Sequence, residues 1–192
     1  MSTPPDEYYS EERWSNWIGR LREEEIDPEN EDSARLLLNL QDDAAIAVAK
    51  IIANFEEGVL DEDGALEELV QVRDIVLSDV DFEDEEKLLL LDGVQTSLVC
   101  VFYAAEEYIV DGPPSDGSVE EFVSAAAEAE AEEDLDSAIS YCAQAGTLII
   151  DGEELDIAVA EDLEYGLVAE WVNGLDSLQT ALAEPEPVET DE

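Results

Sequence analysis

The chain has 192 residues, of which 54 are Asp or Glu, seven are Lys or Arg and none is His, so its formal net charge is −47. Hydrophobic residues make up 45% of the chain, which is too many for an acidic disordered protein and enough to bury a core. Every cation lies before residue 88, which argues against a nucleic-acid-binding surface, and the absence of His excludes His-based acid–base or nucleophilic catalysis.

The first half of the chain predicts a flexible start followed by four helices. Residues 1–9 contain Pro4 and Pro5 and are expected to be flexible. A helix is predicted over about 11–26, and the next begins after Asp27-Pro28, with Asp27 as its N-cap. A third helix is expected over about 62–78, and a fourth, capped by Asp81, over about 83–110.

The second half begins at the loop "DGPPSDG", residues 111–117, which is the clearest break in the helical pattern. Ser118 and Glu121 form a capping-box signature for a fifth helix, and Asp134 precedes a sixth. Residues 153–183 predict one helix or a broken pair, with a bend at Gly166 or Gly174. The segment 184–192 is expected to be a disordered acidic tail.

These elements predict an all-α protein of about seven helices, arranged as an antiparallel bundle or a short array of helical hairpins around the apolar helix at about 83–110. A single domain is expected over 10–183, with a possible subdivision at 111–117. The most apolar run, 93–105, has 13 residues, which is too short to cross a bilayer and suits a core helix. Cys100 and Cys142 are isolated among apolar residues, which favours buried free thiols in a reducing cytosol.

The charge predicts a protein adapted to high salt. A folded chain of this size exposes roughly 9,000 Å², so its carboxylates lie on the order of 13 Å apart. The Debye length is about 10 Å at 0.1 M salt and about 3 Å at 1 M, so molar salt screens repulsion that ordinary buffer leaves in place. Because the acids run from end to end and no signal peptide is evident, we expect a cytoplasmic protein that needs high potassium chloride to fold.

The stretch "RWSNWIGRLR", residues 13–22, places scarce cations beside two of the three Trp residues. A helical wheel puts the apolar side chains on one stripe and the arginines on its flanks. The stripe consists of Trp14, Trp17, Ile18 and Leu21, and the flanking cations are Arg13, Arg20 and Arg22. Such a helix can pack on its own bundle, or it can bind an unknown partner protein or a second copy of the chain. A helix on a membrane surface is disfavoured by the net charge.

Four acids offer a possible metal site. Glu130, Glu133, Glu153 and Asp156 are spaced as ExxE followed by ExxD, which resembles the magnesium site of helical nucleotide pyrophosphohydrolases. In a chain so rich in Glu this loose pattern also arises by chance, and no cation follows Lys87 to meet a triphosphate. Magnesium is expected only if these four acids form a metal site, and otherwise we expect no cofactor.

Two further patterns indicate helical hairpins. "EDLDSAISYCAQA", residues 133–145, resembles the turn and second helix of a tetratricopeptide repeat. In this alignment Ala138 and Ala145 occupy small positions of the second helix, and the preceding helix places Phe122 at the aromatic position and Ala126 at a small one, although the fit is partial. "LDEDGALEEL", residues 60–69, lacks the first and last acids of a calcium loop and therefore predicts a helix start.

Three stretches, "YYSEERW", "EEEIDPENEDSARLLLNLQDDAAIAVAKI" and "DGVQTSLVCVFYAAEEY", together resemble a haloarchaeal family known as domain of unknown function 2150. The resemblance covers nearly the whole chain and implies a salt-loving archaeal cytoplasm, but it brings no activity and no functional residue. The helical hairpins, the Trp/Arg stretch and the lack of catalytic groups favour a non-enzymatic interaction or scaffold protein. The alternative is a metal-dependent nucleotide phosphohydrolase that uses the four acids.

Overall fold

The computed structural model describes residues 8–25, 27, 29–164 and 166–183, and within them the chain forms eight helices and no strand. The helices are α1 (Glu11–Glu23), α2 (Glu31–Glu56), α3 (Glu62–Val76), α4 (Glu85–Val110), α5 (Val119–Ala131), α6 (Leu135–Ile150), α7 (Ile157–Glu161) and α8 (Leu167–Ala183). The predicted all-α fold is confirmed. The helix beyond the seven expected is α7, which together with α8 forms the broken pair expected over 153–183.

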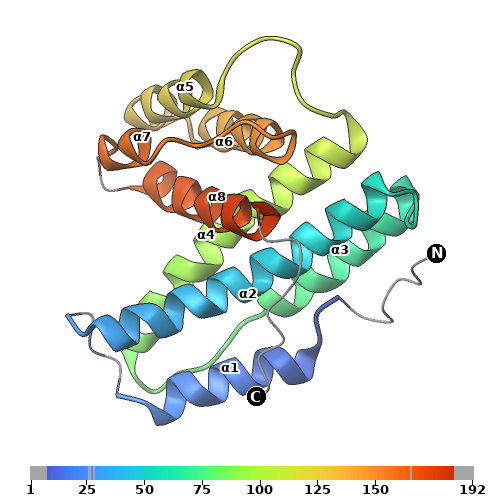
Figure 1. Ribbon diagram of the computed structural model, residues 1–192. Coiled ribbons are helices and arrows are strands. Elements are labelled where there is room, and N and C mark those ends of the chain that lie inside the picture. The colour runs from blue at the N-terminus through green and yellow to red at the C-terminus, as the bar shows by residue number, and fades with distance from the viewer. Residues whose placement is uncertain (1–7, 26, 28, 165, 184–192) are drawn as a thin grey trace.

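The centre of the fold is α4, which crosses the molecule between two groups of helices (Figure 1). The first three helices lie on one side of it and the last four on the other, and α4 packs directly against α2, α3, α6 and α8. Its buried side chains face several directions, as expected for a helix that others surround. The predicted central helix is therefore confirmed, and one hydrophobic core runs across the loop 111–117 without a break.

The central helix is longer than the apolar run on which the sequence argument against a membrane span rested. It has 26 residues with a mean hydropathy of 1.7 over its most apolar window, so by length and composition alone it could cross a bilayer. Half of that window is buried against the other helices, which is the situation of a core helix in a globular protein. Its central place in the bundle thus accounts for the buried half of this apolar window.

The start of α2 differs from the sequence prediction. The N-cap is Asn30, whose side-chain oxygen accepts a hydrogen bond from the Asp32 backbone N–H at 2.9 Å. The Asp27 carboxylate instead accepts from the Glu29 backbone N–H at 2.9 Å, within the turn before the helix. Pro28 lies outside the described residues. Asp27 therefore stabilises a local turn, as short acidic side chains commonly do, and does not cap the helix.

The start of α4 is corrected in a similar way, whereas the later caps are as predicted. Asp84, not Asp81, caps α4 by accepting from the Glu86 backbone N–H at 3.0 Å. Ser118 and its partner three residues later form the predicted capping box at α5, and Asp134 caps α6. At each of these starts a side-chain oxygen satisfies a backbone N–H that has no partner inside the helix.

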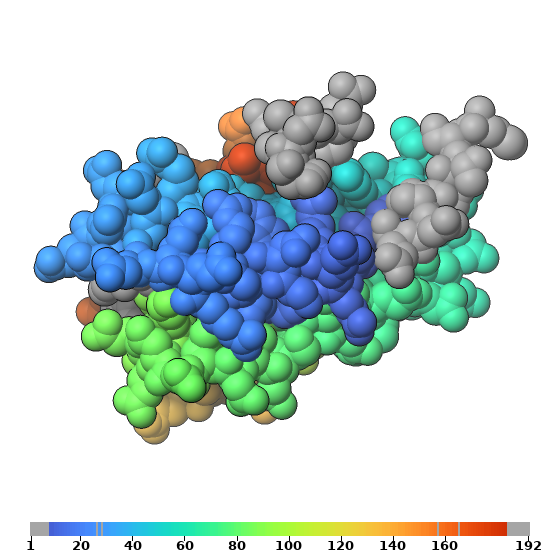
Figure 2. Space-filling model, turned by 90° about the horizontal axis from the view of Figure 1, so that it is seen from below, coloured from blue at the N-terminus to red at the C-terminus, as the bar shows by residue number. Residues whose placement is uncertain are grey.

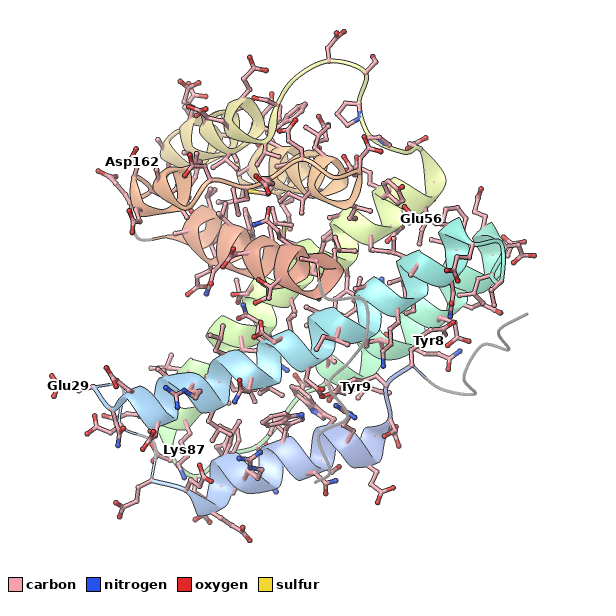
Figure 3. The ribbon with its side chains drawn as sticks, viewed as in Figure 1. Tyr8, Tyr9, Glu29, Glu56, Lys87 and Asp162 are labelled. Carbon is pink, nitrogen blue, oxygen red and sulfur yellow. The ribbon has the colours of Figure 1, made fainter. Side chains whose placement is uncertain are left out.

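The start of the chain is more ordered than predicted, because Tyr8 and Tyr9 are buried in the core. The Tyr8 hydroxyl accepts a hydrogen bond from the Asn54 side-chain amide of α2. Tyr9 lies between α1 and α2 (Figure 3), and burial together with the neighbouring Asp43 carboxylate raises the pKa of its hydroxyl. The expected flexibility of 1–9 therefore does not extend to these two residues; the remainder of that segment and the predicted tail 184–192 lie outside the described residues.

Small residues allow α4, α6 and α8 to approach one another closely. At Gly174 in α8, an added Cβ would lie only 2.1 Å from the Ser97 carbonyl oxygen of α4. At Gly146 in α6, an added Cβ would lie 2.4 Å from the Ala104 Cβ. Gly174 lies within the unbroken α8, and close packing against α4 accounts for a glycine at this position.

We expect Gly174→Ala to destabilise the fold by at least about 2 kcal/mol, because α8 must move away from a backbone oxygen that cannot give way. Gly19→Ala in α1 is the matched control, since no heavy atom lies within 4 Å of its added Cβ. That change should stabilise the protein by up to about 1 kcal/mol through helix propensity. Thermal unfolding of both variants in molar KCl measures the difference; equal melting temperatures would contradict the close packing of α4 and α8.

Candidate protein-binding groove

The Trp/Arg stretch forms α1, which packs on its own domain. Trp14, Ile18 and Leu21 are buried in the shared core. Figure 2 shows α1 in dark blue, lying between the lighter blue α2 and the green beginning of α4. Since three members of the predicted stripe are covered by the chain itself, they offer little surface to a partner. Of the two arrangements that the sequence left open, this packing supports the first.

One buried carboxylate, Asp43 of α2, organises the contacts of α1. Its side chain is 9% exposed and accepts hydrogen bonds from the Arg13 guanidinium and, at 2.9 Å, from the Trp17 indole N–H. A buried charge is stable only when it is paired with an opposite charge and hydrogen-bonded. Arg13 supplies the opposite charge, and Arg13 and Trp17 together supply the hydrogen bonds. The scarce cation and the half-buried indole at the start of α1 are therefore explained by a single acid on the neighbouring helix.

The other end of α1 is fixed by further cation contacts. The Arg22 guanidinium donates to the Asp81 carbonyl at 2.9 Å and lies 5.4 Å from the centre of the Phe82 ring. Lys87 at the start of α4 donates to the Arg22 carbonyl at 3.0 Å (Figure 3). Arg20 lies over the Trp17 ring at 5.1 Å. The contacts of Arg22 and Lys87 hold α1 against the loop before α4 and the start of α4, whereas Arg20 packs on a ring of its own helix.

The acids of the proposed magnesium site have separate structural roles. The Glu130 carboxylate accepts a hydrogen bond from the Val168 backbone N–H at 3.2 Å, at the start of α8. Glu153 accepts from the Val119 backbone N–H at the start of α5, and Asp156 is the N-cap of α7. A carboxylate at a helix N-terminus satisfies a free N–H and interacts favourably with the helix dipole. Three of the four acids in the ExxE and ExxD pattern therefore accept hydrogen bonds at helix starts.

The fourth acid, Glu133, lies in the turn between α5 and α6 with a φ of +63°. Among the residues that the structure describes, no group of three or more His, Cys, Asp or Glu side chains could hold a metal ion. The four acids are therefore not brought together as a magnesium site.

A groove of about 330 Å³ lies between the C-terminal half of α4 and α6. We call it the α4/α6 groove. Its lining residues are Tyr103, Glu106, Glu107, Val110, Asp111, Ile139, Ser140 and Ala143. Tyr103 is 53% exposed and Val110 is 48% exposed, although both belong to the central helix. The groove thus combines an apolar surface with three carboxylates and contains no Lys or Arg.

Glu107 is the unusual member of the groove. Its Oε2 atom is buried and has no hydrogen-bond partner. Burial, followed by the neighbouring charges of Asp111 and Glu106, raises the pKa of its carboxyl above the ordinary value. Buried polar atoms in proteins nearly always have a partner, so this oxygen is an exception, as are the Tyr9 hydroxyl and the Trp14 indole N–H.

Two cysteines, Cys100 of α4 and Cys142 of α6, lie fully buried close to this groove and are free, as predicted. Burial and the neighbouring Cys142 thiol raise the pKa of the Cys100 thiol well above its ordinary value. Because reactivity requires the thiolate, these cysteines are protected packing residues of the α4–α6 contact.

A smaller hollow of about 110 Å³ lies on the other flank of α4, against α3. It is lined by Leu66, Leu69, Val70, Arg73, Phe102 and Glu106, so Glu106 borders both hollows. An apolar, carboxylate-edged surface therefore extends across the exposed part of α4.

Sequence reasoning missed this surface because it assigned all of the apolar residues of α4 to the core. Tyr103 and Val110 are seven residues apart and share one face of the helix. To identify these two residues as exposed, one must know which faces of α4 the neighbouring helices cover, and the sequence does not give this information.

A family model described as "Uncharacterized protein conserved in archaea (DUF2150)" matches residues 7–191 of the chain. No curated protein matches the chain, and no solved structure does.

Proposed function

The chain belongs to the archaeal family DUF2150, and we propose that it is a non-enzymatic protein that binds an apolar segment of another protein in the α4/α6 groove. The observation that carries this proposal is the exposure of Tyr103 and Val110 above a 330 Å³ hollow. Aromatic side chains bordering a groove are typical anchors of protein interfaces.

The chemistry of the groove supports binding without catalysis. Its polar groups are Glu106, Glu107, Asp111, the Ser140 hydroxyl and the Tyr103 hydroxyl. None of these pairs a nucleophile with a base in the arrangement that covalent catalysis requires, and the lining contains no cation to stabilise an anionic transition state. A partner segment that covers the two exposed apolar side chains would gain the free energy of burying them.

We further propose that the protein works in the cytoplasm of an archaeon that accumulates salt. The support is the even distribution of 54 acids against seven cations, which favours folding in concentrated potassium chloride. In such a solution charge attraction over long distances is screened, whereas burial of apolar surface remains effective. An apolar groove is therefore a suitable binding device for this environment.

Cross-linking from inside the groove tests the proposal. We expect a photo-reactive residue at position 103 to form a specific adduct with one protein in the native cell, and the same residue at Leu89 to form none. Leu89 is the matched control because it lies on the same helix and is 72% exposed, but does not line the groove. Tyr103→Glu should weaken binding of the purified partner at least about 30-fold, as the loss of an interface anchor does, and Leu89→Glu should leave it unchanged.

Two results would contradict the proposal. The first is an identical set of adducts from positions 103 and 89, which would indicate non-specific contact. The second is magnesium-dependent nucleotide hydrolysis in molar KCl that Glu153→Gln abolishes. Gln retains a side-chain oxygen that can accept the Val119 N–H, so loss of turnover in a variant that still folds would indicate the phosphohydrolase alternative. An adduct that joins two copies of the chain would indicate that the groove binds the chain itself and not another protein.

A further inference from the structure

We infer that the two contacts of α8, with α2 and with α4, set the salt requirement of this fold. At each contact a half-buried carboxylate lies near a second carboxylate of the neighbouring helix, so falling salt loosens α8 from both neighbours. The inference rests on the salt adaptation proposed above and goes further, because it names which of the 54 acids make the fold depend on salt.

The first contact joins the two groups of helices directly, since α8 packs on α2 as well as on α4. Gln41 of α2 donates to the Ser177 hydroxyl of α8 at 2.8 Å, and both side chains are buried. Each has an acid as its neighbour in sequence, Asp42 on α2 and Asp176 on α8. Burial raises the pKa of the Asp42 carboxyl, a hydrogen bond with Ser177 lowers it, and the charge of Asp176 raises it. Two like charges therefore meet beside the hydrogen bond that links the groups.

The second contact repeats this arrangement between α8 and α4. The Glu170 carboxylate of α8 lies over Gly93 of α4, where an added Cβ would be 3.7 Å from its Oε1 atom. The residue before that glycine is Asp92. Burial, followed by the charge of Asp92, raises the pKa of the Glu170 carboxyl. A second pair of like charges thus spans the other side of α8.

Tight packing keeps these acids together. At Gly174 an added Cβ would lie 2.1 Å from the Ser97 carbonyl oxygen, so α8 lies directly against the α4 backbone. Trp171 and Leu175 of α8 are buried in the core. Moving α8 outward to separate the charges would expose these side chains to water, which is unfavourable. The repulsion therefore acts directly against the packing of the core.

The chain offers these carboxylates little opposite charge. No cation follows Lys87, so α8 has none, and Lys87 itself donates to a backbone carbonyl of α1. Arg35 and Lys50 of α2 lie seven and eight residues from Asp42, which is about two turns of helix. The two ion pairs in the described part of the chain lie between α1 and α2 and within α3. Compensating charge must therefore come from dissolved cations.

Dissolved salt can act on both contacts, because Asp92 and Asp176 are exposed. Their half-buried partners, Glu170 and Asp42, lie in surroundings of lower dielectric, where like charges repel more strongly than in water. Molar KCl shortens the Debye length to about 3 Å and screens the exposed member of each pair. These two pairs should therefore respond to salt more strongly than an isolated surface acid does.

Unfolding on dilution of KCl, followed by circular dichroism, tests the inference. The wild type, Asp42→Asn, Asp176→Asn and the double variant form one cycle, and Glu128→Gln, which neutralises an exposed acid of α5, is the control for net charge. We expect each single variant to lower the KCl concentration at the midpoint at least about twice as far as the control does. The double variant should lower it little further, because both changes remove the same repulsion.

Asp92→Asn and Glu170→Gln form the second cycle, for which we expect the same pattern. Shifts no larger than that of Glu128→Gln, or shifts that add up in either cycle, would overturn the inference. If Asp42→Asn fails to fold in about 3 M KCl, the exposed Asp176→Asn decides for that contact alone, by comparison with the control.

The same measurements separate this inference from the salt adaptation on which it rests. A wild type whose fold does not depend on KCl would refute the adaptation itself. A wild type that unfolds at low KCl, with α8 variants that behave like the control, would refute only the role assigned to α8.

Discussion

We expect the protein to be folded in about 3 M KCl and to unfold there in one cooperative transition on heating, and we expect it to lose its fold below about 0.1–0.5 M KCl. The reason is the density of acids, because the chain has 54 Asp and Glu residues and only seven Lys and Arg residues that could pair with them. Arg13 and Arg73 each meet an acid, but these contacts cannot offset the remaining charge. Circular dichroism during dialysis against decreasing KCl measures this effect, which we expect to be larger than that of any single substitution.

Lowering the pH should partly replace the salt. Burial raises the carboxyl pKa values of Asp42, Glu107 and Glu170, and neighbouring acids raise them further. The folded state then binds protons more tightly than the unfolded state, so stability increases as the pH falls from neutral towards the ordinary carboxyl values near about 4. Protonation of exposed acids lowers the overall repulsion in the same direction.

Sucrose is the control for the salt experiment, because it favours compact states by exclusion but screens no charge. We expect sucrose in low-salt buffer to restore the fold much less than KCl does. A protein that is equally stable in water and in about 3 M KCl would contradict the account of its charge.

Trp14→Ala should destabilise the fold by about 3–5 kcal/mol, as truncation of a buried aromatic side chain does. Trp14 is buried among the core residues and belongs to the same cluster as the central helix. A loss of this size is a large part of the roughly 5–15 kcal/mol that stabilises a typical domain. Thermal unfolding in molar KCl measures the loss, and light scattering on the same samples records the oligomeric state.

Two neighbouring substitutions are controls for this experiment. Trp14→Phe should cost much less, because it keeps most of the ring and removes an indole N–H that is buried without a hydrogen-bond partner. Arg20→Ala should cost about 0–1 kcal/mol, since its exposed guanidinium lies over the Trp17 ring and molar salt weakens surface electrostatics further. Unchanged stability in Trp14→Ala together with lost association would instead make α1 a partner-binding helix.

Much of the local structure followed from the sequence. Apolar residues at intervals of three and four identified the long helices, and the pairing of Ser118 with Glu121 located the start of α5 to the residue. The errors lay where several short polar residues competed for one role. Asp27 and Asn30 are both acceptable N-caps, and only the path of the chain determined which of them accepts from a helical N–H.

The candidate site was beyond the reach of the sequence. Tyr103 looked like a core residue because the sequence does not say how many faces of α4 its neighbours cover. Glu130 and Glu153 looked like a metal site because the sequence does not say which distant N–H group a carboxylate meets. In the structure each acid lies at the start of another helix, 38 and 34 residues away along the chain.

The sequence by itself determined the properties that depend on composition and on near neighbours: a charge of −47, an all-helical chain and a long apolar central helix. These follow from side-chain chemistry and from hydrogen bonds within a few residues. Only the tertiary structure decided that α1 covers its own core, that three of the four predicted metal ligands accept hydrogen bonds at helix starts, and that a groove with an unpartnered Glu107 oxygen lies between α4 and α6. The physical reason is that burial and partner choice depend on which helices meet in space, and a single sequence records no such contacts.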